Sequence, residues 1–481
     1  MNHIMIALKE KSDLTDRRVP EDQSPPPPQD PQGISARAEA LLEMGRFEDA
    51  KQLYSSLCEA DSDNPLGLLG LAHVEEHQRH WNEAITRFED LLARFPNNLD
   101  GLHGIAPALA KVGRYDDAAS VYRTLCELHP ERLSGWLGLA KVLQDQRRWA
   151  EALEAYDNVQ KRFPENPEAC TAKAEVLSEL GQLKQALAVY HQLFKIPSLR
   201  GKVVLGLAYA SREAEERRAA YEACRQWAGL TDATRRHPAV SGKNLIIGHS
   251  HIKAIRDALS ASTLPRDNFV THFLPNRPLV SPSGDIDDQW RKCLILCDSA
   301  ARVFLSTGGN EHTILGLPQH PVPYAFSEML AIAGGHETAG DHYIPSSLVK
   351  EILKKRMAST TKVIHFLAAL FRNKLYLLES PPPSPSEEHL RTALDQNAYL
   401  IENVGRYGIS PAPLRLGLWR IRSEIMKKIT QALSCVYLTC PTASQDDAGY
   451  LIEPAWSNAT HANERYGAMV VEQIADVIKD A

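Results

Sequence analysis

The chain has 481 residues, which is enough for two or three domains, and its formal net charge is −6. Because charges of both signs are mixed and no basic stripe stands out, the composition argues against a nucleic-acid partner. No stretch approaches the roughly 18 apolar residues that a membrane-spanning helix needs, and the N-terminus does not resemble a signal peptide. The eight cysteines form no CxxC pair, so we expect reduced thiols in a cytoplasmic protein.

Residues 1–30 run into the segment PPPPQDPQG, which begins at Pro25, and show no apolar periodicity. This composition predicts a disordered leader before the first folded domain.

A period of 34 residues follows the leader. Alanine recurs at Ala50, Ala84, Ala118, Ala152 and Ala186, and an aromatic residue stands four places after each one. A small residue where two helices touch, followed one turn later by an aromatic residue, is typical of a helix-turn-helix solenoid. The pattern resembles five consecutive tetratricopeptide repeats. That resemblance implies an all-α scaffold with a concave groove that binds a protein or peptide partner.

Beyond Ser198 the apolar pattern predicts one more helix, in which we expect Arg218 to replace the packing alanine. A charged residue there suits a capping helix whose outer face meets solvent. The repeat domain is therefore expected to span 31–235, and a short linker separates it from a second domain at 240–481.

The second domain alternates strands and helices. Four buried strands are predicted in the segments NLIIG, ARVFLST, KLYLLES and CVYLTC, with helical segments between and after them. Repeated strand-then-helix order predicts a parallel sheet with helices on both faces, an α/β/α three-layer domain. In such sheets the functional groups collect at the carboxyl ends of the strands.

Three polar segments carry the candidate functional residues. Gly248-His249-Ser250-His251 follows the first strand, Ser306 to His312 follows the second, and Asn458 to Asn463 precedes the last helix. A serine at a strand-to-helix turn places its N–H at the positive end of a helix, which suits an anionic intermediate. Asn310 can donate to the same oxyanion, and His461 can take a proton from Ser250.

Together the segments GHSH, GGNE and NATH resemble the motifs of the SGNH or GDSL hydrolase superfamily, whose domains are α/β/α and flavodoxin-like. The resemblance implies a serine esterase or acyltransferase without a cofactor, acting on a small ester or an acylated carbohydrate such as an acetyl ester. It assigns Ser250 as the nucleophile, His461 as the base, and Ser250, Gly308 and Asn310 as oxyanion donors. Gly284 is a further candidate donor.

The sequence departs from the family pattern at two places. His249 replaces the usual aspartate beside the nucleophile, and Asn458 stands where the family has the aspartate that orients the histidine. An amide accepts an N–H bond but provides no charge to stabilise an imidazolium, so we expect a weaker base. Asp446, Asp447 and Glu453 are alternative orienting acids. The other interpretation is a catalytically impaired domain, in which case the protein is a scaffold or assembly factor.

Each candidate residue also has a structural interpretation. Ser250 in a strand-helix turn is a possible helix N-cap, and Asn310 a possible turn residue. His249, His251, His312 and His461 are possible metal ligands, but none of the four stands in an HxxxH or HExxH motif, so no metal is expected. The remaining candidates for the pocket are His249, His251, Glu311, His312 and Glu379. Glu379 equally fits a role in ending its strand.

Overall fold

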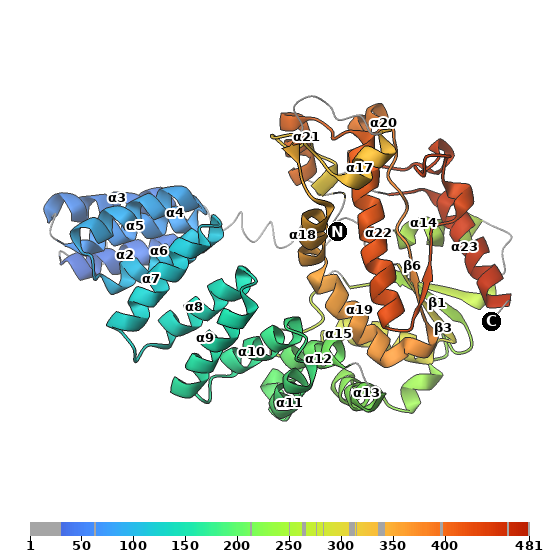
Figure 1. Cartoon of the computed structure of the whole chain (residues 1–481), viewed down its shortest axis with the longest axis horizontal. Coiled ribbons are helices and arrows are strands. Elements are labelled where there is room, and N and C mark those ends of the chain that lie inside the picture. Colours follow the sequence, from blue (N-terminus) through green and yellow to red (C-terminus); the bar gives the residue numbers. More distant parts are fainter. Residues whose placement is uncertain are drawn as a thin grey trace, which may run out of the picture. The chain divides into compact units, whose positions relative to one another are not determined.

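The chain divides into two compact units, the first ending at Leu180 and the second beginning at Gly181 (Figure 1). The structure, a computed structural model, describes residues 30–61, 64–211, 214–249, 251–261, 266–275, 277–281, 283–306, 313, 315–334, 342–394, 398–458 and 461–479. Apart from Asp30, the expected leader lies outside the described residues. No helix among those described is long and apolar enough to cross a membrane.

The first unit is a succession of antiparallel helix pairs with the expected period. The first helix of each pair begins at Pro31, Pro65, Leu99, Leu133 and Pro167, steps of 34 residues. The helices are α2 Pro31–Glu43, α3 Phe47–Ala60, α4 Pro65–His77, α5 Trp81–Arg94, α6 Leu99–Lys111, α7 Tyr115–Leu128, α8 Leu133–Asp145, α9 Trp149–Arg162 and α10 Pro167–Glu179. The helical solenoid predicted from the alanine period is therefore confirmed.

Packing explains why the period holds. The repeating alanines have no exposed surface, and four of the five aromatic residues behind them face a glycine of the next repeat: Tyr54, Phe88, Tyr122 and Tyr190. A Cβ atom added to Gly104 would lie 2.2 Å from the ring of Phe88, and one added to Gly70 would lie 2.0 Å from the ring of Tyr54. Neighbouring repeats therefore interlock through an aromatic ring against a bare backbone, a contact that allows no larger residue.

Side-chain caps begin several of these helices. The amide oxygens of Asn64, Asn98 and Asn166 accept hydrogen bonds from backbone N–H groups of the helices that follow them, at 3.0, 2.7 and 2.8 Å. These asparagines satisfy N–H groups that a helix start leaves without intrahelical partners.

The turns inside the helix pairs need a left-handed residue. Gly45 and Gly113 adopt it with φ of 73° and 82°, and Arg79 and Arg147 adopt it at the equivalent places with φ of 63° and 59°. Only glycine tolerates this region without steric cost, so the two arginine turns are strained.

The second unit is built on a parallel sheet whose strands run in the order β2-β1-β3-β6-β7 (Figure 1). The strands are β1 Asn244–Gly248, β2 Phe269–Phe273, β3 Arg302–Ser306, β6 Leu375–Leu378 and β7 Val436–Leu438. A separate two-stranded parallel ladder joins β4 Tyr324–Ala325 to β5 His342–Tyr343. The chain reverses its direction across the main sheet between β1 and β3.

Helices cover both faces of this sheet. Successive residues of β1 alternate between two hydrophobic cores: Leu245 and Ile247 face one, and Ile246 faces the other. The helices are α14 Ile252–Ala261, α15 Asp288–Ser299, α17 Ser327–Ile332, α18 Ser346–Arg356, α19 Ala358–Phe371, α20 Glu387–Thr392, α21 Ala398–Tyr407, α22 Ala412–Ala432 and α23 Glu464–Lys479. The expected parallel sheet with helices on both faces is confirmed.

Three helices before the sheet belong to the second unit, although we expected the boundary near 235–240. They are α11 Leu183–Phe194, α12 Arg200–Ala210 and α13 Ala214–Ala228. Cys224 and Trp227 of α13 are buried in one core with sheet residues such as Leu245. Arg225 also forms a buried ion pair with Asp298 of α15 at 2.7 Å. The repeat pattern in the sequence thus extends into a unit held together by other contacts.

The expected single capping helix is a pair, α12 and α13, which meet at the extended backbone of Ser211. The prediction that Arg218 takes the alanine position is wrong. The residue 34 places after Ala186 is Ala220, which is 1% exposed, whereas Arg218 is exposed. The period therefore continues for one further helix, with Cys224 in the place of the aromatic residue.

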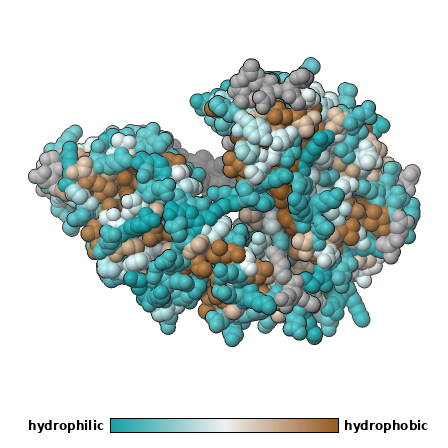
Figure 2. Space-filling view, in the orientation of Figure 1, coloured by the Kyte–Doolittle hydropathy of each residue, from teal (hydrophilic) through white to brown (hydrophobic). Residues whose placement is uncertain are grey.

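Two other elements differ from expectation. β2 was not predicted, because its half-buried residues on the edge of the sheet lack a continuous apolar run. The segment SLVKEILKKRMASTTKVIHFLAALFR, residues 347–372, was expected to form one long helix but is split into α18 and α19 at Met357. Figure 2 shows hydrophilic residues over most of this face of both units, with smaller apolar patches between them.

We expect Arg79→Gly to stabilise the first unit by about 1 kcal/mol, because glycine removes the left-handed strain in the turn. The same substitution in the middle of α5, Arg87→Gly, should destabilise it by about 1 kcal/mol. Urea unfolding followed by circular dichroism measures both changes. Two shifts of the same sign would contradict the strained-turn interpretation.

Candidate active site

The site begins at the carboxyl ends of β1 and β3. Gly248 and Ser306 are paired in register at the ends of these neighbouring strands. A Cβ atom at Gly248 would lie 2.5 Å from the Ser306 carbonyl oxygen, so the close approach of the strands requires glycine there. This edge is where the strand order reverses, the usual position of ligand sites in open parallel sheets.

The candidate nucleophile and oxyanion residues follow directly on these strand ends. Ser250 lies outside the described residues, as do Gly308, Asn310, Glu311 and His312. The neighbours of Ser250 in the chain are described: His249 follows β1, and His251 is buried immediately before α14. The position of Ser250 is thus bracketed in the chain by two described histidines.

A short loop before α23 holds the candidate base. Trp456 and Ala462 form an isolated antiparallel bridge that closes the loop. Asn463 then caps α23: its Oδ1 accepts from the Arg465 N–H at 2.9 Å, and its Nδ2 donates to the carbonyls of Pro454 and Trp456, both at 2.9 Å. One asparagine thereby fixes both the helix start and the base of the loop.

Within this loop, Nδ1 of His461 lies 2.8 Å from Oδ1 of Asn458. The amide oxygen only accepts, so this hydrogen bond places the proton on Nδ1 and leaves the lone pair on Nε2. That is the tautomer a general base needs when it takes a proton through Nε2. Asn458 is therefore the side chain that fixes this tautomer of His461.

The alternative orienting acids have other surroundings. Asp446 accepts from the N–H groups of Ala448, Gly449 and Tyr450 at 2.9 to 3.0 Å, which stabilises a turn. Asp447 and Glu453 are exposed. Asn458 is the residue that the structure places on Nδ1 of His461.

The contact between α14 and α23 brings the first and third segments together. A Cβ atom at Gly467 would lie 2.1 Å from the Ala254 carbonyl oxygen, so the two backbones touch. The rings of His251 and His461, just before these helices, have centroids 5.1 Å apart. His251, immediately before α14, and the loop of His461 are therefore neighbours.

His251 is neutral in this environment. Burial lowers its pKa from 6.5 to about 3, with smaller contributions from the nearby His461, Arg422 and His249. Its Nδ1 is buried without a hydrogen-bond partner among the described residues. A neutral imidazole beside His461 adds no fixed positive charge to the site.

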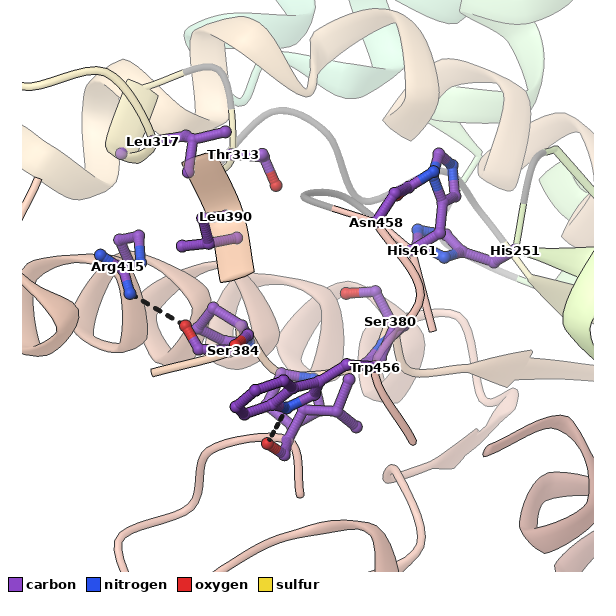
Figure 3. Close-up of a pocket in the computed structure, with 15 residues that line it drawn as sticks. His251, Thr313, Leu317, Ser380, Ser384, Leu390, Arg415, Trp456, Asn458 and His461 are labelled. Carbon is purple, nitrogen blue, oxygen red and sulfur yellow. Dashed lines mark hydrogen bonds between the residues drawn. The ribbon is translucent and has the colours of Figure 1, made fainter. Parts of the chain in front are cut away.

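These residues line one cavity of about 40 Å³ (Figure 3). Asn458, His461 and His251 lie at one side of it, and Arg415 lies at the other, with Leu317 and Leu390 between them in the view. Ser380, the three prolines after it, Ser384 and Trp456 complete much of the wall. Sequence reasoning missed Arg415, which comes from α22, far along the chain from the motifs, and Trp456, which stands two residues before Asn458 but outside the family motif.

Glu379 is placed next to the cavity but engaged elsewhere. Its carboxylate accepts from the Tyr437 hydroxyl at 3.1 Å and from the Cys440 N–H at 2.8 Å. The next residue, Ser380, lines the cavity, and its Oγ accepts from Arg422 at 3.2 Å. Glu379 thus links the end of β6 to β7. This link holds the next residue, Ser380, in the wall of the cavity.

Two further candidates from the sequence are placed as follows. Gly284 packs against Gly201 of α12, its carbonyl accepts from the Trp227 indole of α13 at 3.3 Å, and it does not line the cavity. Among the described residues no group of three or more His, Cys, Asp or Glu side chains is arranged to hold a metal ion. His312, one of the four histidines considered, lies outside that set.

The first unit has a groove of its own. It is lined by the described residues Ser35, Glu39, Tyr54, Leu66, Leu69, Gly70, His73, Glu76, Asp100, His103 and Gly104. Three of these are carboxylates and none is lysine or arginine. Glu39 also raises the pKa of Tyr54, which reaches about 12 mainly through burial.

Comparison with protein families identifies the repeats. One tetratricopeptide repeat model matches residues 103–167, and a second matches 41–106 and 143–196. Residues 41–196 form a tetratricopeptide repeat array. The matched region ends at residue 196, before the sheet. A search of curated proteins found no match to the chain.

Several solved structures are similar to part of the chain. YrrB, described as a TPR protein with an unusual peptide-binding site, is 20% identical and covers 35% of this chain and 86% of its own, with a TM-score of 0.31. PilF of Pseudomonas aeruginosa is 19% identical and covers 42% and 91%, with a TM-score of 0.36. MamA of Desulfovibrio magneticus is 15% identical and covers 36% and 97%, with a TM-score of 0.33.

The neutral state of His251 predicts a pH-dependent stability. Below pH 6.5 the unfolded chain protonates this side chain, while the folded one does so only near pH 3. Unfolding therefore becomes easier as the pH falls, by about 2 kcal/mol between pH 7 and 5 for one such group. His251→Gln should remove this part of the dependence in urea unfolding of the second unit.

His342→Gln, which changes an exposed histidine of the same unit, is the control and should keep the native pH dependence. If His251→Gln leaves the pH dependence as steep as in the native chain, His251 is not buried in its neutral form.

Proposed function

We propose that the second unit is a serine ester hydrolase or acyltransferase of the SGNH type, carried by a tetratricopeptide array that binds a protein or peptide. The observation that carries the proposal is the 2.8 Å contact between His461 Nδ1 and Asn458 Oδ1 beside a cavity. This hydrogen bond sets the tautomer of the proposed general base, His461. The ring of His461 lies beside His251, the residue that follows Ser250 in the chain. The strand order β2-β1-β3-β6-β7 is that of flavodoxin-like sheets, which supports the fold assignment.

In the proposed reaction, Nε2 of His461 takes the proton of the Ser250 hydroxyl while Oγ attacks the ester carbonyl carbon. The carbonyl oxygen becomes an oxyanion, which the N–H groups of Ser250 and Gly308 and the amide of Asn310 stabilise. Collapse of this intermediate breaks the ester bond, and the imidazolium gives its proton to the leaving alcohol. Water, or an acceptor alcohol, then removes the acyl group from Ser250 by the same steps in reverse.

Asn458 sets the expected rate. Its amide orients the ring as an aspartate would, but it provides no negative charge when His461 becomes an imidazolium. Arg422 and His249, whose positive charges lower the pKa of His251, lie in the same region. We therefore infer an active but slow catalyst.

The cavity suits the acyl part of an ester, because apolar side chains including Leu317, Leu390 and Leu451 line it. An acetyl ester of a carbohydrate is the substrate class that we favour.

A second candidate function is a binding scaffold without catalysis. The groove of the first unit favours binding as one part of the protein's role. Glu39, Glu76 and Asp100 make the groove acidic. A segment with lysine or arginine side chains complements such a groove and associates faster at low salt. We infer that the array binds a cationic peptide segment of its partner.

For catalysis, we expect slow hydrolysis of 4-nitrophenyl acetate by the native protein and none by Ser250→Ala. Asn458→Asp should raise kcat at least tenfold, because a carboxylate beside His461 stabilises the imidazolium; the reverse change costs a serine protease about 10⁴-fold. Ser457→Asp adds the same charge to the exposed neighbouring side chain and is the control.

Hydrolysis that Ser250→Ala leaves unchanged would contradict the assignment of the nucleophile. If Asn458→Asp raises the rate no more than Ser457→Asp does, the amide does not occupy the orienting place. An absence of hydrolysis in all forms would favour the scaffold alone.

For binding, a fluorescent peptide of alternating lysine and alanine should bind the array, and the matched glutamate peptide should not. Fluorescence anisotropy should show at least tenfold weaker binding for Glu39→Gln/Asp100→Asn. Glu48→Gln/Asp90→Asn removes two charges from α3 and α5 outside the groove and should leave the affinity within twofold. Equal binding of both peptides would refute an acidic docking groove.

A further inference from the structure

Arg415 is a buried cation in the wall of the candidate active-site cavity. It lies on α22, is 5% exposed, and stands across the cavity from His461 (Figure 3). Neither the repeat pattern nor the three hydrolase motifs involve this residue.

Its described partners are all backbone carbonyls. Nη1 donates to Ser410, and Nη2 donates to Ser384 and Pro385 at 2.9 and 3.0 Å. Nε is buried without a hydrogen-bond partner among the described residues. A guanidinium has five N–H donors, so these carbonyls leave Nε–H and another donor unused.

Within the described part of the chain no carboxylate forms an ion pair with Arg415. Glu387 is a carboxylate whose charge raises the pKa of Arg415, but it is exposed and pairs with Arg391 at 3.2 Å. The contrast is Arg225, which is similarly buried but paired with Asp298 at 2.7 Å. A buried charge without a counter-charge is costly, and burial accordingly lowers the pKa of Arg415 to about 10.

The three carbonyls also make the cation rigid. They come from two chain segments, 384–385 and 410, and together they fix the position of the guanidinium. A guanidinium already fixed in place loses little entropy when it binds a carboxylate, and its planar donors match a carboxylate's two oxygens. The cavity therefore has the proposed base, His461, at one side and a rigidly held cation, Arg415, at the other.

We propose that Arg415 is a specificity residue that binds a carboxylate of the substrate, so that the protein prefers esters carrying this negative group at a distance from the ester bond. The inference deepens the proposed hydrolase function and rests on it. Leu317, Leu390 and Trp456, which line the cavity, contact the part of the substrate between the two polar ends.

Two matched pairs of esters test this in the full-length protein. Mono-4-nitrophenyl succinate and 4-nitrophenyl butyrate differ by a carboxylate on the acyl side. 4-Acetoxybenzoate and 4-tolyl acetate differ by a carboxylate on the alcohol side. In one of the two pairs, kcat/KM for the acidic ester should exceed that of its neutral partner at least tenfold, and the pair identifies which side of the ester faces Arg415.

Arg415→Gln should reduce that preference to within twofold, because it lowers kcat/KM for the acidic ester more than for the neutral one. Arg415→Lys should keep part of it. Arg420→Gln is the matched control, because Arg420 is exposed on the same helix and donates to the Ala448 carbonyl at 2.7 Å. No preference in either pair, or a preference that survives in folded Arg415→Gln, would overturn the proposal.

Binding separates this inference from catalysis. Calorimetry with 4-acetoxybenzoate and with mono-4-nitrophenyl succinate on Ser250→Ala should show affinity for at least one of them, weakened at least tenfold by a second substitution, Arg415→Gln. Arg415-dependent binding without any ester hydrolysis would retain the carboxylate site and remove the proposed hydrolase. Hydrolysis without a carboxylate preference would do the opposite. If Arg415→Gln does not fold, the native protein's preference within the two ester pairs decides.

Discussion

The candidate site depends on a backbone contact between α14 and α23. Gly467 has no side chain, and any Cβ there would collide with the Ala254 carbonyl at 2.1 Å. This contact brings the segment after the first strand next to the segment before the last helix, although about 200 residues separate them in the chain. His251 and His461 are neighbours for this reason.

Two other contacts fix the geometry of the candidate site. The close approach of β1 and β3 at Gly248 aligns two strand ends, and Asn463 ties the His461 loop to its own helix. Only the orienting group is unusual, since Asn458 fixes the tautomer of His461 without a charge. In the proposed hydrolase, His461 is a weakened base, and Arg415 supplies the charge that holds a carboxylate of the substrate.

Periodic features were predictable from the sequence. The repeats follow from alanines and aromatic residues at 34-residue spacing, and β1, β3, β6 and β7 follow from continuous apolar runs. Asn458 and His461 are close in sequence, so their pairing was expected. β2 was missed because an edge strand is half-buried, and the boundary at Leu180 was missed because α11–α13 keep the repeat pattern while packing on another core. Arg415 depends on tertiary burial, which no local pattern reveals.

The central claim is that Ser250 is a nucleophile activated by His461. The most direct measurement is peptide mapping by mass spectrometry after reaction with a fluorophosphonate, which forms a covalent adduct with an activated serine. The account predicts one adduct, on Ser250, that is formed at least tenfold more slowly in His461→Ala. An adduct on another residue, or labelling of Ser250 at an unchanged rate in His461→Ala, would contradict it, as would the absence of any adduct.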